Sequence, residues 1–133
     1  MARRGFTLIE VVVALAAVAM LAAFALPTFA GRLNAARRAD ATAALERIQA
    51  AQERHRALHG LYASELSALG QTSGSLEGLY ALSLEAGPGE GYTAVARARS
   101  DGPQRDDTAC AEITLRVEQG FATYGPSRRC WNR

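Results

Sequence analysis

The sequence predicts an α+β fold, in which a long N-terminal helix carries a small antiparallel sheet of about four strands on its C-terminal half. Two observations lead to this prediction. Hydrophobic residues are concentrated at the start of the chain, where they make up 23 of the first 31 residues. The rest of the chain alternates short strand-like runs with glycine-containing turns. The single apolar run excludes a polytopic membrane protein, and the modest remainder argues against a large enzyme with a deep core.

The apolar segment is long enough to cross a membrane. Residues 11–31 carry no charge, and a helix of that length spans about 31 Å, the thickness of a bilayer's hydrocarbon core. Basic residues flank both ends, so the positive-inside rule favours a cytoplasmic N-terminus only slightly. A cleaved secretory signal is the alternative, because alanine-rich cleavage sites lie inside the run.

Residues 32–59 predict a continuation of the helix as an amphipathic stalk. Apolar side chains recur there at three- and four-residue steps, and most of the arginines fall outside that stripe. Gly60 then provides a helix stop. The predicted helix runs from residue 6 to residue 59. Its first half has nothing in this chain to pack against, so it requires either lipid or sister helices.

The C-terminal part predicts a connecting region with a short helix at residues 64–69, followed by the sheet. Strand-like runs at residues 80–85 and 92–99 flank a Gly-Pro-Gly loop that suits a hairpin. Residues 112–118 alternate between apolar and polar side chains, as a half-buried strand does. A Gln-Gly turn then leads into a last strand at residues 121–124.

Cys110 and Cys130 are the only cysteines of the chain, and they lie ten residues either side of Gly120. A hairpin that turns near Gly120 brings them face to face, so the register predicts a disulfide. A disulfide that closes a loop of this length stabilises the folded state by roughly 3 kcal/mol. A disulfide also indicates an oxidising compartment. Cys110 shares its parity with the polar positions of the adjacent strand, which predicts a bond on the outer face or beyond a bulge.

Glu10 is the one charge inside the apolar N-terminus. A carboxylate there costs several kcal/mol unless it is paired, and no basic residue follows within helical reach. Its candidate partners are a lipid headgroup, a free α-amine or another subunit. The alternative is that Glu10 lies at the level of the lipid headgroups.

The run Gly-Phe-Thr-Leu-Ile-Glu that ends at Glu10 follows a short basic leader and precedes the apolar helix. It resembles the prepilin signature of type IV pilins. The resemblance implies that a prepilin peptidase cuts between Gly5 and Phe6 on the cytoplasmic face, and that the new Phe6 amine is methylated. It also implies that Glu10 meets the N-terminal amine of a neighbouring subunit in the filament. Pro27 matches a proline that the family commonly has in this helix, where proline bends the axis.

The cysteine pair and the Cys130-Trp131 ending are similar to the disulfide-bounded loop of type IVa minor pilins. With the N-terminal signature, the resemblance covers nearly the whole chain. It implies the type IV pilin fold, divided into a leader (1–5), a transmembrane and filament-core helix (6–31), an amphipathic stalk helix (32–59), and a connecting loop with a disulfide-bonded β head (60–133).

The resemblance implies a structural subunit of a type IV pilus, most similar to a minor pilin that acts in pilus assembly or priming, with roles in twitching motility and adhesion. The expected partners are other pilin subunits through the N-terminal helix, the prepilin peptidase, the inner-membrane assembly machinery and the membrane itself. The subunit would cross the inner membrane once, with a cytoplasmic N-terminus and a periplasmic head, and later join the extracellular fimbrium. The alternatives are a major pilin, a pseudopilin of type II secretion, or a DNA-binding pilin of competence.

The sequence offers no catalytic grouping, so no enzyme activity, cofactor or metal site is expected. His55 and His59 share one helix face, but Arg56 occupies the place of a metalloprotease Glu and no third ligand is evident. The acidic pair Asp106-Asp107 is interpreted as a solvated loop.

A nucleic-acid partner is not expected, because residues 60–133 hold seven arginines against nine acidic residues, a net charge of −2. A strongly basic face is therefore missing from the head as a whole. The sequence leaves open a local cluster of the arginines Arg97, Arg99, Arg116, Arg128 and Arg129.

Overall fold

The structure is a computed structural model that describes residues 5–87 and 90–133, with the backbone alone at residues 27 and 28. The chain divides into two compact units, Met1–Leu33 and Asn34–Arg133. We call the second unit the head. The predicted leader, apart from its last residue Gly5, lies outside the described residues, as do the two central residues of the predicted hairpin loop.

Helix α1 (Leu8–His59) contributes its first part to the N-terminal unit and the remainder to the head. In the N-terminal unit, every described large hydrophobic side chain of residues 6–29 is exposed. By length and composition this segment is suited to crossing a membrane. This exposed apolar surface therefore requires lipid or other helices as a partner, as the sequence predicted.

The head contains one antiparallel sheet in which the strands are ordered as they occur in the chain. This arrangement confirms the predicted fold class. The observed strand limits differ from the predicted ones by one residue at most, which is the usual uncertainty of strand ends. The strands are β1 (Tyr80–Ala86), β2 (Gly91–Ala98), β3 (Glu112–Glu118) and β4 (Phe121–Gly125).

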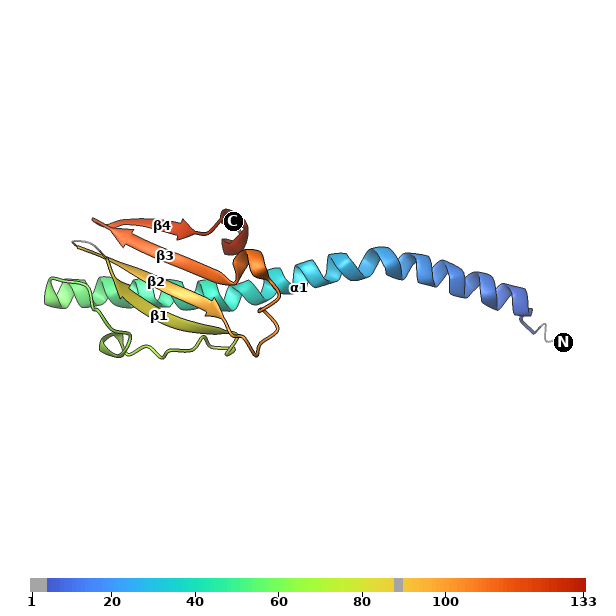
Figure 1. Cartoon of the computed structure of the whole chain (residues 1–133), viewed down its shortest axis with the longest axis horizontal. Helices are drawn as coiled ribbons and strands as arrows, with labels where there is room; N and C mark the ends of the chain where they lie inside the picture. The colour runs from blue at the N-terminus through green and yellow to red at the C-terminus, as the bar shows by residue number, and fades with distance from the viewer. Residues whose placement is uncertain (1–4, 88–89) are drawn as a thin grey trace. The chain divides into compact units, whose positions relative to one another are not determined.

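The core of the head lies between the sheet and the second part of α1, which run side by side in Figure 1. Alternation along β3 buries Ile113, Leu115 and Val117 and exposes Glu112, Arg116 and Glu118, because successive side chains of a strand point to opposite faces. Small alanines of α1 let the sheet approach the helix closely. The helix contributes Ala41, Ala44, Leu45 and Ile48 to this core.

Polar side chains of α1 hold the connecting segments against the helix. The amide of Gln52, which is fully buried, accepts a hydrogen bond from the Ala63 N–H at 2.8 Å and donates one to the Ala63 carbonyl at 2.9 Å. The Asp40 carboxylate accepts hydrogen bonds from the N–H groups of Glu77 and Leu79 at 3.0 and 3.4 Å. These contacts satisfy backbone groups that would otherwise be buried at a cost.

Three short 3₁₀ helices complete the described part of the head. The first, η1 (Ser67–Leu69), occupies the end of the predicted short helix. The other two, η2 (Thr108–Cys110) and η3 (Arg128–Trp131), each carry one of the two cysteines, which form a disulfide. The expectation that this bond would lie on the outer face is wrong, because both cysteines are buried in the core. Cys110 belongs to η2, ahead of β3, so the alternation of the strand does not reach it.

Candidate functional site

The start of α1 brings together the residues that the N-terminal signature singled out. Gly5, Phe6, Thr7 and Glu10 line one shallow hollow. The Thr7 N–H donates to Oε2 of Glu10 at 3.4 Å, and the Thr7 carbonyl accepts from the Glu10 N–H at 3.1 Å. Thr7 and Glu10 therefore occupy the Ncap and N3 positions, and the bond from the Thr7 N–H is the half of a capping box that the N3 carboxylate supplies. The positive end of the helix dipole also favours a carboxylate at this place.

No ion pair of the described residues involves Glu10, and the side chain of Phe6 is 82% exposed. Within a single chain the Glu10 carboxylate is thus turned toward the beginning of its own helix. Pro27 lies within α1, and its side chain is outside the described residues. The structure therefore places Phe6 and Glu10 side by side and adds Thr7, which the sequence had not singled out.

A buried ion pair connects α1 to the segment before β3. Arg38 donates from Nε and Nη2 to the two carboxylate oxygens of Asp107, each at 2.7 Å. The two side chains are only 4% and 7% exposed. The hydrogen bond and the negative charge of Asp107 raise the pKa of Arg38. The interpretation of Asp107 as part of a solvated loop is therefore wrong, because this carboxylate is the buried partner of a helix arginine.

Two further contacts extend the pair in both directions. Arg38 also donates from Nη1 to the carbonyl of Arg129 at 3.3 Å, which joins the helix to η3. Gln104, which is fully buried, donates to the hydroxyl of Tyr80 at 3.0 Å and to Asp107 at 3.4 Å. Burial raises the pKa of Tyr80, although the hydrogen bond from Gln104 opposes that rise. The two 3₁₀ helices that carry the disulfide are thus fastened to one point of α1.

The last residues of the chain are held on the same side of the head. Trp131 donates from its indole N–H to the carbonyl of Gly125 at 2.9 Å, and Asn132 donates to the carbonyl of Ala35 at 2.9 Å. Arg133 lies over the ring of Tyr124 at 4.7 Å. These contacts hold the backbone of η3 on both sides. The positions from which its exposed side chains extend are therefore fixed.

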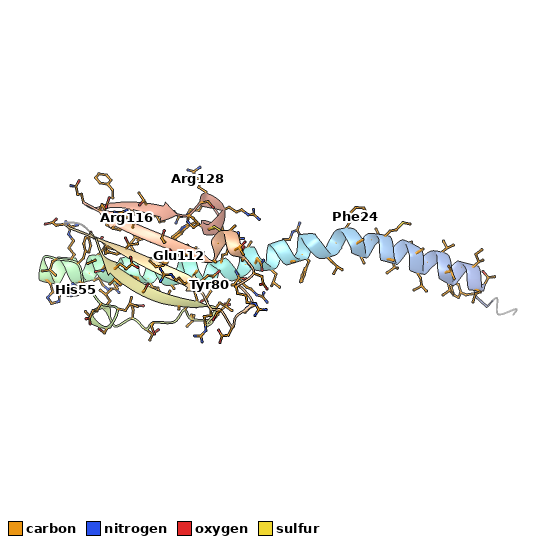
Figure 2. All side chains as sticks on the ribbon, in the orientation of Figure 1. Phe24, His55, Tyr80, Glu112, Arg116 and Arg128 are labelled. Carbon is orange, nitrogen blue, oxygen red and sulfur yellow. A yellow bond between two sulfur atoms is a disulfide. The ribbon has the colours of Figure 1, made fainter. Side chains whose placement is uncertain are left out.

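The arginines of the sheet and those of η3 differ in their partners. On the outer face of the sheet, Arg97 pairs with Glu112 and Arg116 pairs with Glu118, each at 2.6 Å. By contrast, Arg128 and Arg129 are exposed in η3, and no ion pair within residues 5–87 and 90–133 involves either of them. Figure 2 labels Glu112 and Arg116 on the sheet and Arg128 on the C-terminal segment.

Arg99 is likewise paired, with Asp101 at 3.2 Å. The five arginines that the sequence left as a possible local cluster therefore separate into three paired side chains and two without an acidic partner among the described residues. Of these five, only Arg128 and Arg129 make no ion pair with a carboxylate of the described residues.

Two family models match this sequence. Residues 1–26 match the prokaryotic N-terminal methylation motif. Residues 27–114, about two thirds of the chain, match the family described as type IV minor pilin ComP, DNA uptake sequence receptor. The chain belongs to this family of type IV minor pilins. No curated protein matches it.

The two matches confirm the resemblance that the N-terminal signature and the cysteine pair indicated. The pilin families are structural rather than catalytic, and the methylation motif with its apolar helix fits a pilin anchored in the inner membrane. The minor pilin match includes Arg38, Asp107 and Cys110 but ends before β4 and η3. The exposed arginines of η3 are therefore a feature of this chain outside the matched segment.

Sequence reasoning missed Arg38 and Gln52 as buried residues, although a signal for them exists. Positions 38, 41, 45, 48 and 52 follow the three- and four-residue steps of the buried stripe of α1. A polar side chain on such a stripe indicates a buried partner. The identity of that partner has no comparable signal, since Asp107 lies 69 residues from Arg38.

Proposed function

We propose that this chain is a structural subunit of a type IV pilus, a minor pilin that acts in pilus assembly or priming. The observation that carries the proposal is the start of α1. There a methylation motif, a capping glutamate and an exposed apolar helix occur together. Twitching motility and adhesion are the activities that a fault in assembly would impair.

In this proposal the prepilin peptidase cuts between Gly5 and Phe6, and the new Phe6 amine is methylated. The subunit then stays in the inner membrane, with its head in the periplasm, until the assembly machinery adds it to the fibre. Glu10 pairs with the Phe6 amine of a neighbouring subunit as the apolar helix moves from lipid into a bundle. A pairing of this kind makes a charge tolerable in apolar surroundings. Pro27 contributes to the shape of the helix in that bundle.

Two variants separate the charge of Glu10 from its capping role. Glu10→Gln keeps an oxygen that can accept the Thr7 N–H, as a capping box allows, but it removes the charge. Glu10→Ala removes both. We expect both variants to accumulate in the membrane and neither to enter fibres, as measured by immunoblots of sheared pili against whole membranes. Normal entry of Glu10→Gln into fibres would exclude the proposed charge pairing.

Processing and the place in the fibre have tests of their own. Mass spectrometry of the mature chain should find it beginning at a methylated Phe6, and any other beginning would refute the proposed cut.

Deletion of the gene should reduce the number of surface pili and twitching while the main subunit is still found in the remaining fibres. Loss of all fibre protein would instead identify a major pilin.

A second candidate function is contact with DNA, which the description of the matched family names for that family. The feature of this chain that favours it is the pair of exposed arginines on η3, Arg128 and Arg129. Two guanidinium groups that make no ion pair with the described residues suit phosphate oxygens. The net charge of −2 over residues 60–133 opposes this function, and the arginines of the sheet face are already offset by Glu112 and Glu118.

Salt-dependent retention of duplex DNA tests this candidate with the full chain in detergent. Replacing Arg128 and Arg129 by glutamine should weaken retention and lower the salt slope by about two, because each phosphate contact contributes about 0.9. The matched control replaces the paired arginines Arg97 and Arg99, and it should change retention much less. If the chain did not retain DNA at low salt, DNA binding would be excluded. If the control lost as much retention as the Arg128 and Arg129 variant, a specific role of η3 would be excluded.

A further inference from the structure

The last turns of α1 bring the two histidines of the chain together. His55 and His59 are the only histidines in the sequence, and their ring centroids lie 4.3 Å apart with the planes tilted by 42°. Figure 2 labels His55 near the C-terminal end of α1. Residues four apart lie on the same face of a helix, so the contact follows directly from the sequence spacing.

The hydrogen bonding of His55 fixes which of its nitrogens is available. Nδ1 lies 3.0 Å from the carbonyl oxygen of Leu61. A carbonyl oxygen can only accept, so Nδ1 carries the hydrogen and the lone pair of the neutral ring is on Nε2. Histidines that bind metals have this arrangement, in which one nitrogen donates to a backbone carbonyl and the other faces the ion. The contact therefore orients the His55 ring as a ligand.

The surroundings leave room for an ion and its water molecules. Both histidines line a hollow of about 190 Å³ together with Ala51, Arg54, Leu58 and Leu69. His59 is exposed, so its ring can adjust to an ion. At a metal–nitrogen distance of about 2.0–2.1 Å, two imidazoles at right angles around one ion have ring centroids roughly 4.5 Å apart, and the observed separation of 4.3 Å is close to this.

The local charges act in both directions. The carbonyl groups at the C-terminal end of α1 favour a cation, whereas the guanidinium of Arg54 opposes one. Arg56 is drawn to the other side, since it lies over the Tyr62 ring at 5.0 Å and within 3.6 Å of the Glu90 carboxylate. No group of three His, Cys, Asp or Glu side chains in the described part of the chain could complete a closed site.

We propose that His55 and His59 form a two-imidazole site for a divalent transition-metal ion, with water in the remaining coordination positions. Imidazole ligands select Cu²⁺, Ni²⁺ or Zn²⁺ over Ca²⁺ and Mg²⁺, which prefer oxygen. Cu²⁺ binds most tightly in this series. The site does not depend on the proposed role in pilus assembly, because all its ligands belong to one chain.

Cu²⁺ binding by the full chain in detergent, prepared without a histidine tag, tests the proposal. Both cysteines are in the disulfide, so no free thiol competes for the ion. Electron paramagnetic resonance at one Cu²⁺ per chain should show coupling to two imidazole nitrogens. In His59→Gln the coupling to one nitrogen should disappear. The affinity for Cu²⁺ should fall at least about tenfold. Losing only the hydrogen-bond partner of a metal ligand already costs about that much, and this variant loses a ligand itself.

Two controls keep the test decisive. Arg54→Gln removes a positive charge beside the site without removing a ligand, and it should bind Cu²⁺ at least as tightly as the original chain. His55→Gln/His59→Gln removes both imidazoles and should lose the two-nitrogen signal entirely. A failure of the original chain to bind Cu²⁺, or a spectrum that is the same in the double variant, would overturn the proposal.

Discussion

Replacing Arg38 by methionine should destabilise the head by about 3–5 kcal/mol, because it leaves the Asp107 carboxylate buried without its partner. The two side chains are 4% and 7% exposed, so solvent cannot replace the lost guanidinium. The carbonyl of Arg129 also loses a donor. For a unit of the size of Asn34–Arg133, 1 kcal/mol shifts the Tm by roughly 5 °C. The expected fall in Tm is therefore about 15–25 °C.

The fluorescence of Trp131 provides the assay for this variant. It is the only tryptophan of the chain, it is buried, and it lies in η3, which Arg38 fastens to the helix. Its emission therefore reports the unfolding of the head separately from the apolar helix in detergent. Arg37→Met is the matched control, since Arg37 makes no ion pair among the described residues, and it should change stability by less than about 0.5 kcal/mol.

The double variant Arg38→Met/Asp107→Leu decides between a lost ion pair and lost packing. Removing both charges leaves apolar groups of similar size, which is often neutral for a buried pair. The double variant should therefore recover most of the stability that the single variant loses. A single variant that loses less than about 1 kcal/mol, or a double variant as unstable as the single one, would refute this account of the pair.

Three further predictions concern the core of the head. The Tyr92 hydroxyl is buried without a hydrogen-bond partner among the described residues, so Tyr92→Phe should leave stability unchanged or raise it by up to about 1 kcal/mol in urea unfolding; a clear loss would reveal a partner. Replacing Cys110 and Cys130 by serine should cost about 3 kcal/mol, measured by the same unfolding against the original chain, because the bond closes a loop of 20 residues. Burial raises the pKa of Tyr80 and of Tyr92, so their protonated forms are favoured by folding. The contribution of the two protonated tyrosines to the free energy of unfolding is fully present below the unfolded tyrosine pKa of about 10. It falls as the pH rises above that value. Unfolding midpoints between about pH 8 and pH 11 should show this fall, and Tyr80→Phe/Tyr92→Phe should reduce it.

The elements that the sequence predicted well depend on local spacing. The buried stripe of α1 and the alternation along β3 are periodic patterns within one segment, so they require no knowledge of the partner segment. The apolar N-terminus is a still simpler case, because a helix with an apolar surface all round requires lipid or other helices. The pilin signature at Gly5, Phe6 and Glu10 is likewise a continuous run of residues.

The features that the sequence did not determine depend on contacts between distant segments. Asp107 lies in a polar loop, and only its position against Arg38 makes it a buried ion-pair partner. In the sequence Cys110 shares the parity of the polar positions of β3, but it belongs to a 3₁₀ turn, in which the alternation of a strand does not apply. The arginines of the head are alike in the sequence, and only the sheet register and the path of η3 separate paired from unpaired charges.

The sequence by itself therefore determined the fold class, the apolar helix and the membership of the pilin family, since each follows from periodicity or from a contiguous motif. The tertiary structure decided how η2 and η3 are fastened to α1 and which charges face solvent. The physical reason is that a buried charge is tolerated only beside a partner of opposite charge. For Arg38 and Asp107 that partner is 69 residues away and is supplied by packing alone.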